Sequence, residues 1–259
     1  MSPPERRATL ALALAVAMLA GCGKANLPSG VPAGAARIPA ARSGRPARAP
    51  VPARVAVPLR LTAARASDFA RAVNLRAVDV PGARPGPRSA ESQEGRQEAA
   101  ICSHGEALPV GGGRSAKLER GSGLEAESIS SSVVVMPSVR AARADLAYAD
   151  SRPGLACFTR VIRRKLERES SSTVAIGHVA VAPLTVGSGA TRAMGLRIAA
   201  ELSGVRSGLG LGLFVDVLGF DYGPAELELY ATSFVQPTPT RTEEELLALM
   251  RARARRSRL

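Results

Sequence analysis

Tryptophan is absent from this 259-residue chain, and aromatic residues of all kinds make up only 3% of it. Nucleic-acid-binding domains usually stack bases on aromatic rings and carry a basic patch on their folded part. The net charge of +13 does not predict such a patch, because the basic excess lies in residues 23–60 and 251–259. Residues 61–250 hold 21 basic and 21 acidic side chains. The sequence therefore argues against a nucleic-acid partner.

Histidine is also scarce, with two residues in the chain, and the serine-hydrolase motif Gly-x-Ser-x-Gly does not occur. Cys102 and His104 are close in sequence, but no second cluster of metal ligands accompanies them. The alternating glycines 208, 210 and 212 run into a strand pattern instead of the helix that a dinucleotide fingerprint requires. We expect neither a metal nor a cofactor.

Long hydrophobic runs are missing too. The apolar or small run from Ala8 to Ala20 has 13 residues, and a helix needs about 20 to cross a bilayer. A charged start followed by a short apolar stretch is typical of an export signal. The motif Leu19-Ala20-Gly21-Cys22 resembles the lipobox of bacterial lipoproteins. That resemblance implies that Cys22 is lipidated, becomes the first residue and anchors the protein to the membrane.

The resulting domain prediction is a signal peptide at 1–21, a disordered Pro/Ala/Arg-rich spacer at 22–60 and one folded domain at 61–256. It places the protein on the outer face of the cell membrane, where a basic spacer gains attraction to anionic lipid. One alternative is an ordinary secretory signal with a chance cysteine. Export could follow either the general or the twin-arginine route, since Arg6-Arg7 precedes the apolar run.

Two cysteines remain if Cys22 takes the lipid. An even remainder in an oxidising compartment predicts a disulfide between Cys102 and Cys157. The alternative is two separate buried thiols.

Hydrophobic periodicity in residues 61–256 predicts an α+β domain, an antiparallel meander of four to six strands with helices packed on one face. Helices are expected at 64–73, from 138 to about 148, after Arg152-Pro153-Gly154, and after Thr242, whose spacing to Glu245 fits a capping box. The expected strands are 129–136, 173–182, 194–203, 209–219 and 225–235.

A meander of this kind should keep one polar face in solvent. We expect a shallow, glycine-floored depression on that face, able to bind a sugar or polar peptide. Its rim is formed by Arg197, Asp216, Glu226, Glu228 and Tyr230. The alternative is an ordinary solvated sheet face.

Several segments together suggest a family. These are Ser131-Ser132-Val133-Val134-Val135-Met136-Pro137-Ser138, the cysteine pair, and Ala231-Thr232-Ser233-Phe234 ahead of Thr242-Glu243-Glu244-Glu245. Residues 65–250 thereby resemble the extracytoplasmic sensor domain of actinobacterial receptor serine/threonine kinases and related secreted lipoproteins. The resemblance implies a binding or sensing domain. This chain can form one disulfide where members of the family have two, so no ligand site is carried over.

Two function classes follow. The first is a lipid-anchored binding or sensor-like domain, not an enzyme, that recognises a small molecule, an envelope polymer or a protein. The alternative is an envelope hydrolase with an unrecognised active site. For that reading Glu226 and Glu228 provide two carboxylates about 7 Å apart on one strand face.

Overall fold

The computed structural model describes residues 61–86, 102, 108–169, 174–186, 193–204, 210–257 and 259. Cys22, the predicted signal peptide and the predicted spacer lie outside the described residues.

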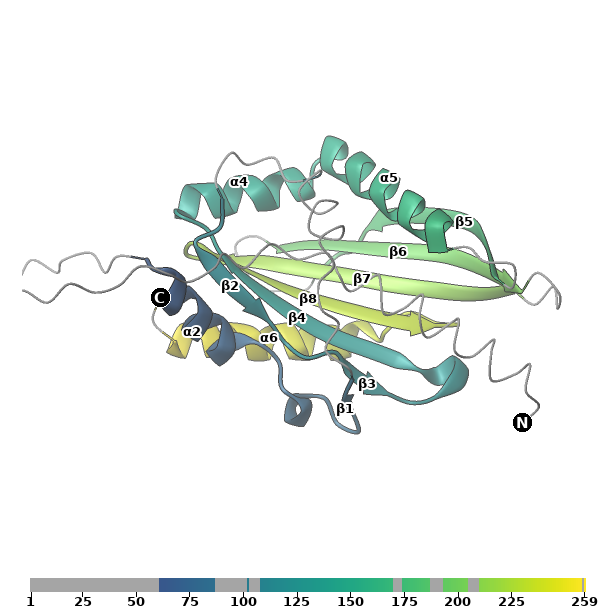
Figure 1. Ribbon diagram of the computed structural model, residues 1–259, viewed down its shortest axis with the longest axis horizontal. Coiled ribbons are helices and arrows are strands. Elements are labelled where there is room, and N and C mark those ends of the chain that lie inside the picture. Colours follow the sequence, from purple (N-terminus) through teal and green to yellow (C-terminus); the bar gives the residue numbers. More distant parts are fainter. Residues whose placement is uncertain are drawn as a thin grey trace, which may run out of the picture.

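An antiparallel sheet forms the centre of the domain (Figure 1). Its strands follow the order β1 (Arg84–Pro85), β3 (Leu118–Arg120), β4 (Glu127–Val135), β8 (Ala225–Phe234), β7 (Gly210–Tyr222), β6 (Ala193–Gly204) and β5 (Val174–Pro183). An eighth strand, β2 (Gly111–Arg114), pairs with the end of β4 beyond β3. Strands β5 to β8 form the predicted meander, so the α+β class is confirmed. The sheet has more strands than the four to six we expected.

Helices cover both faces of this sheet. Helices α2 (Ala63–Val73) and α6 (Thr240–Arg256) lie on one side, and α4 (Val139–Ala149) and α5 (Arg152–Glu169) lie on the other (Figure 1). Two short 3-10 helices lie in the connections, η1 (Ala77–Asp79) between α2 and β1 and η2 (Gly123–Glu125) between β3 and β4. The prediction of helices on one face only is therefore wrong.

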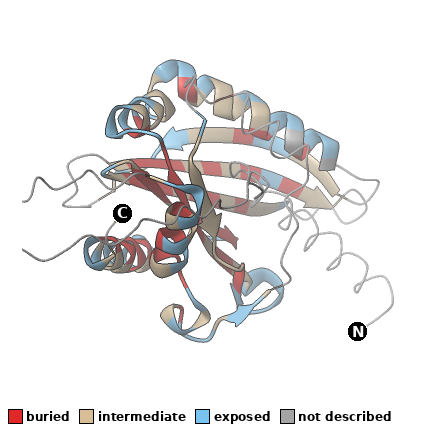
Figure 2. Ribbon diagram, turned by 60° about the vertical axis from the view of Figure 1, so that its left-hand side comes forward, coloured by how far each residue is buried: buried red, intermediate tan, exposed pale blue. Residues whose placement is uncertain are grey.

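The cause is that the strands bury apolar residues on both sides. Leu227 and Leu229 of β8 join a core with Phe69 of α2 and with Leu246 and Met250 of α6. A second core packs beneath α5 on the opposite face and contains Ile162, Leu166, Ile198, Leu213 and Val215. Figure 2 shows the buried residues of the strands between the two helical layers. Each apolar face needs its own cover, because burial of that surface stabilises the fold.

Local signals in the sequence fix the helix starts on each side. Ser138 caps α4 by accepting a hydrogen bond from the Ala141 N–H at 3.1 Å, as its position predicted. Thr62 caps α2 in the same way, accepting from the Arg65 N–H at 3.3 Å.

A disulfide joins Cys102 to Cys157 on α5, with 5.7 Å between the Cα atoms. It is the bond that the cysteine count predicted. The bond spans 55 residues of sequence, and closing a loop of that size stabilises a fold by about 4 kcal/mol in the chain-entropy model. It ties the segment ahead of β2 to the α5 layer.

Candidate functional site

A row of polar side chains crosses β2, β4 and β8 on the face that α4 and α5 occupy. The register pairs Arg114 with Ser132, Ser132 with Glu228, and Ser130 with Tyr230. Their neighbours Val133, Leu227 and Leu229 point into the core beneath α2 and α6, so these polar residues point the other way. We call this row the polar strip; its members are Arg114, Ser130, Ser132, Glu226, Glu228 and Tyr230.

Direct contacts organise the polar strip. The Tyr230 hydroxyl donates a hydrogen bond to Glu228 Oε2 at 2.6 Å. The Arg114 guanidinium lies 5.7 Å from the centre of the Tyr230 ring, a cation–π geometry. Tyr230 is thereby held between a cation and a carboxylate. A cation, a carboxylate, an aromatic ring and two serine hydroxyls at one place can recognise a polar ligand through both charge and hydrogen bonds.

Three of the five residues predicted to bind a ligand come together in the polar strip: Glu226, Glu228 and Tyr230. The other two, Arg197 and Asp216, lie on the opposite face beneath α6. They bind each other there through two hydrogen bonds of 2.7 and 2.6 Å. The prediction that all five share one face is wrong.

The register of the β7–β8 hairpin explains the error. Tyr222 pairs with Ala225 across the two-residue turn Gly223-Pro224, and counting back along the ladder places Asp216 opposite Ala231. Gly223 has φ 59°, which suits the first central position of a two-residue hairpin turn. The Gly-Pro pair was visible in the sequence and would have given the register.

The polar strip is also less exposed than the solvated face we expected. Glu226 and Tyr230 are 4% and 8% exposed, and Ser132 is 1% exposed. Glu228 and Arg114 are partly accessible. Gly212 lies on the face of Asp216 and not beside Glu228, and a Cβ atom there would meet the ring of Phe214. Gly210 has open space around it, and Gly208 lies outside the described residues.

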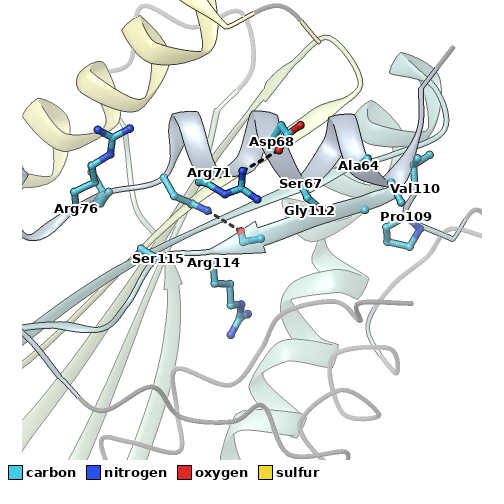
Figure 3. A pocket seen from close by; sticks show the side chains of 15 residues that line it. Ala64, Ser67, Asp68, Arg71, Arg76, Pro109, Val110, Gly112, Arg114 and Ser115 are labelled. Atoms are coloured by element: carbon cyan, nitrogen blue, oxygen red, sulfur yellow. Dashed lines mark hydrogen bonds and ion pairs between the residues drawn. The ribbon is translucent and has the colours of Figure 1, made fainter. Parts of the chain in front are cut away.

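A groove of 810 Å³ runs between α2 and β2. Asp68 and Arg71 on α2 form an ion pair of 2.9 Å along its wall, and Gly111, Gly112 and Gly113 form its other side (Figure 3). Arg114 also lines the groove, but its side chain points away from α2 (Figure 3). Strand β2 therefore stands between the groove and the polar strip.

Glycines on β2 let α2 approach closely. A Cβ atom at Gly111 would lie 3.0 Å from the Ala66 Cβ, and one at Gly113 would lie 3.3 Å from the Ala70 Cβ. Two hydrogen bonds of 2.9 Å hold the end of α2 at the same place. The Asn74 side chain donates one to the Gly113 carbonyl and accepts the other from the buried Ser131 hydroxyl. Strand β2 was not among the expected strands, because glycine is a weak strand former.

Histidine and paired carboxylates are the side chains that acid–base catalysis could use in this chain. His178 is exposed on β5, and His104 lies outside the described residues. Glu226 and Glu228 share a face of β8, as their spacing predicted. Their use as a catalytic pair stays a prediction. Within the described residues, no group of three or more His, Cys, Asp or Glu side chains could hold a metal ion. Nor is any helix in those residues long and apolar enough to cross a membrane.

No protein-family model matches the chain, and no curated protein matches its sequence. Among solved structures it is similar to the extracellular domain of PknH from Mycobacterium tuberculosis, with 11% identity and a TM-score of 0.35, over 74% of this chain and 97% of that one. It is also similar to an uncharacterised protein from Mycobacterium smegmatis, an Rv0999 ortholog. That match has 14% identity and a TM-score of 0.34, over 73% of this chain and 98% of that one. At this level of similarity, functional assignment rests on the chain's own residues.

Proposed function

We propose that this chain is a lipid-anchored binding domain on the outer face of a bacterial cell membrane. Leu19-Ala20-Gly21-Cys22 supports the anchor, because a thiol after small residues is what lipid attachment requires. The Cys102–Cys157 disulfide supports an oxidising compartment, since the cytosol keeps thiols reduced. Residues 23–60, with seven prolines, provide a spacer that holds the domain off the bilayer.

The ligand that fits best is a polar molecule of the envelope, a sugar or a polar peptide. One observation carries this choice, the meeting of Arg114, Glu228 and Tyr230 on one sheet face. Arg114 and Glu228 are partly accessible beside the buried Tyr230, and charged groups of this kind are suited to ligands that offer hydroxyl, amide or carboxylate groups.

Titration calorimetry with soluble peptidoglycan fragments tests this proposal. Glu228→Gln removes the charged hydrogen-bond acceptor and keeps the shape, so affinity should fall by about tenfold or more. Glu201→Gln is the matched control, a strand glutamate exposed on β6 away from the polar strip. It should bind like the parent protein.

Equal binding by the Glu228→Gln and parent proteins would remove the polar strip from the proposal. The same samples also test the alternative function. Cleavage of the fragments that stops in Glu228→Gln would favour a hydrolase that uses Glu226 and Glu228.

A further inference from the structure

A cluster of ionisable side chains is buried between α6 and the sheet, on the face opposite the polar strip. Glu243 in the first turn of α6 is 0% exposed, and Asp216 of β7 is 1% exposed. Arg197 of β6 and Glu127 of β4 reach the same place. Glu243 belongs neither to the predicted ligand site nor to the polar strip on which the proposed function rests.

The Asp216 carboxylate is fully engaged by a cation. Its two oxygens accept hydrogen bonds of 2.7 and 2.6 Å from the Arg197 guanidinium. These bonds raise the pKa of Arg197, and a bidentate pair of this kind favours the ionised carboxylate. Asp216 is thus the member of the cluster that is paired with a cation.

Glu243 has no such cation of its own. Among the described residues, no N–H or hydroxyl group donates to either of its carboxyl oxygens. Glu127 is already bound by Arg120 and by the Thr238 hydroxyl, at 2.7 Å for Thr238. The group that Glu243 contacts is the Asp216 carboxyl. Two carboxyl groups form a hydrogen bond only if one of them carries a proton.

We propose that Glu243 is protonated and donates its proton to Asp216, and that this shared proton is a pH-sensitive latch holding α6 against the sheet. Burial is the largest cause that raises the pKa of Glu243, to about 9, and the nearby charge of Asp216 adds to it. Arg197 opposes the rise and Glu127 contributes to it.

The direction of the pH effect follows from proton linkage. When α6 opens, Glu243 returns to its ordinary pKa of 4.5 and releases the proton. The closed state binds one more proton than the open state between pH 4.5 and about 9, so opening becomes easier as pH rises. Each pH unit in that window should raise the open population by about tenfold.

Hydrogen exchange of the α6 amides from pH 5.5 to 8.5, corrected for intrinsic exchange, tests the latch. In the parent protein, protection should fall by about tenfold per pH unit. Glu243→Gln keeps the shape and supplies a neutral N–H donor to Asp216, so its protection should not change with pH. Glu245→Gln is the control, since Glu245 is an exposed residue of the same helix and pairs with Arg241. It should keep the slope of the parent.

A parent protein without the slope, or Glu243→Gln with the full slope, would overturn the proposal. A second measurement does not depend on a folded variant. In carboxyl-labelled parent protein, the ¹³C resonance of Glu243 should stay at the position of a protonated acid at pH 7. A resonance of an ionised carboxylate at that pH would equally overturn it.

Discussion

At the scale of single residues, the pKa values of Asp79 and Glu243 shift in opposite directions because the two side chains have different partners. Asp79 of η1 accepts two hydrogen bonds of 2.7 Å from the Arg253 guanidinium and one from the Arg76 backbone N–H. Burial raises the pKa of Asp79, but these hydrogen bonds and charges outweigh it and lower the pKa below 3.8. Glu243 meets another carboxyl group in place of a cation, and its pKa rises. The identity of the partner decides the charge state.

Asp79→Asn should destabilise the protein by about 1.5–3 kcal/mol at pH 7, because a hydrogen-bonded charge is lost from a buried pair. A lowered folded-state pKa adds stability above pH 3.8, and that stability is lost as pH falls below it. Urea unfolding at several pH values measures both effects. The difference in free energy of unfolding between Asp79→Asn and the parent protein should become smaller at acidic pH.

Asp68→Asn is the control for this comparison, because Asp68 pairs with Arg71 at the surface with 68% of its side chain exposed. Surface substitutions of this kind change stability by about 0.5 kcal/mol or less. If Asp79→Asn costs no more than Asp68→Asn, the Arg253 pair does not stabilise the fold as described.

At the scale of elements, strong hydrophobic patterns in the sequence were sufficient to predict where the long helices and strands lie. Helix α2, helix α4 and strands β5 to β8 lie within a few residues of their expected positions. The start of α6 was wrong. The Thr242 and Glu245 spacing suggested a capping box, but α6 begins at Thr240, after Pro239. Glu243 therefore lies on the buried side of the first turn. Periodicity alone could not tell which of three consecutive glutamates faces the core.

Strand β2 depends on a glycine that a sequence pattern could not explain. A Cβ at Gly112 would lie 2.2 Å from the Val133 carbonyl oxygen across the ladder. Gly112→Ala should therefore force the strands apart and lower stability by about 1–3 kcal/mol, measured by thermal or chemical unfolding.

Gly210→Ala provides the matched comparison, since a Cβ at Gly210 of β7 has nothing within 4 Å. It should be neutral or stabilise by up to about 1 kcal/mol, because alanine narrows the unfolded ensemble. Equal losses from both substitutions would mean that β2 does not pack against β4 as closely as described.

At the scale of the whole molecule, composition and pattern were enough for the α+β class. They could not predict which residues of different strands share a face of the sheet. That depends on the relative register of neighbouring strands, which one turn fixes for the whole ladder. The Tyr222–Ala225 hairpin placed Asp216 under α6 and Glu228 in the polar strip. Arg114 was missed because its strand was missed. The sequence therefore predicted the half of the polar strip that lies on β8, because polar and apolar residues alternate clearly along that strand.

The proposed location of this domain, outside the cell membrane, depends on a lipid attached to Cys22. The most direct test is metabolic labelling with an alkyne fatty acid, followed by membrane fractionation of cells that express the parent or Cys22→Ser chain. The parent should be labelled and remain in the membrane fraction, because two acyl chains hold a protein firmly. Cys22→Ser should lose the label and leave the membrane. An unlabelled parent, or a Cys22→Ser protein that is still labelled and membrane-bound, would rule out a lipid anchor on Cys22.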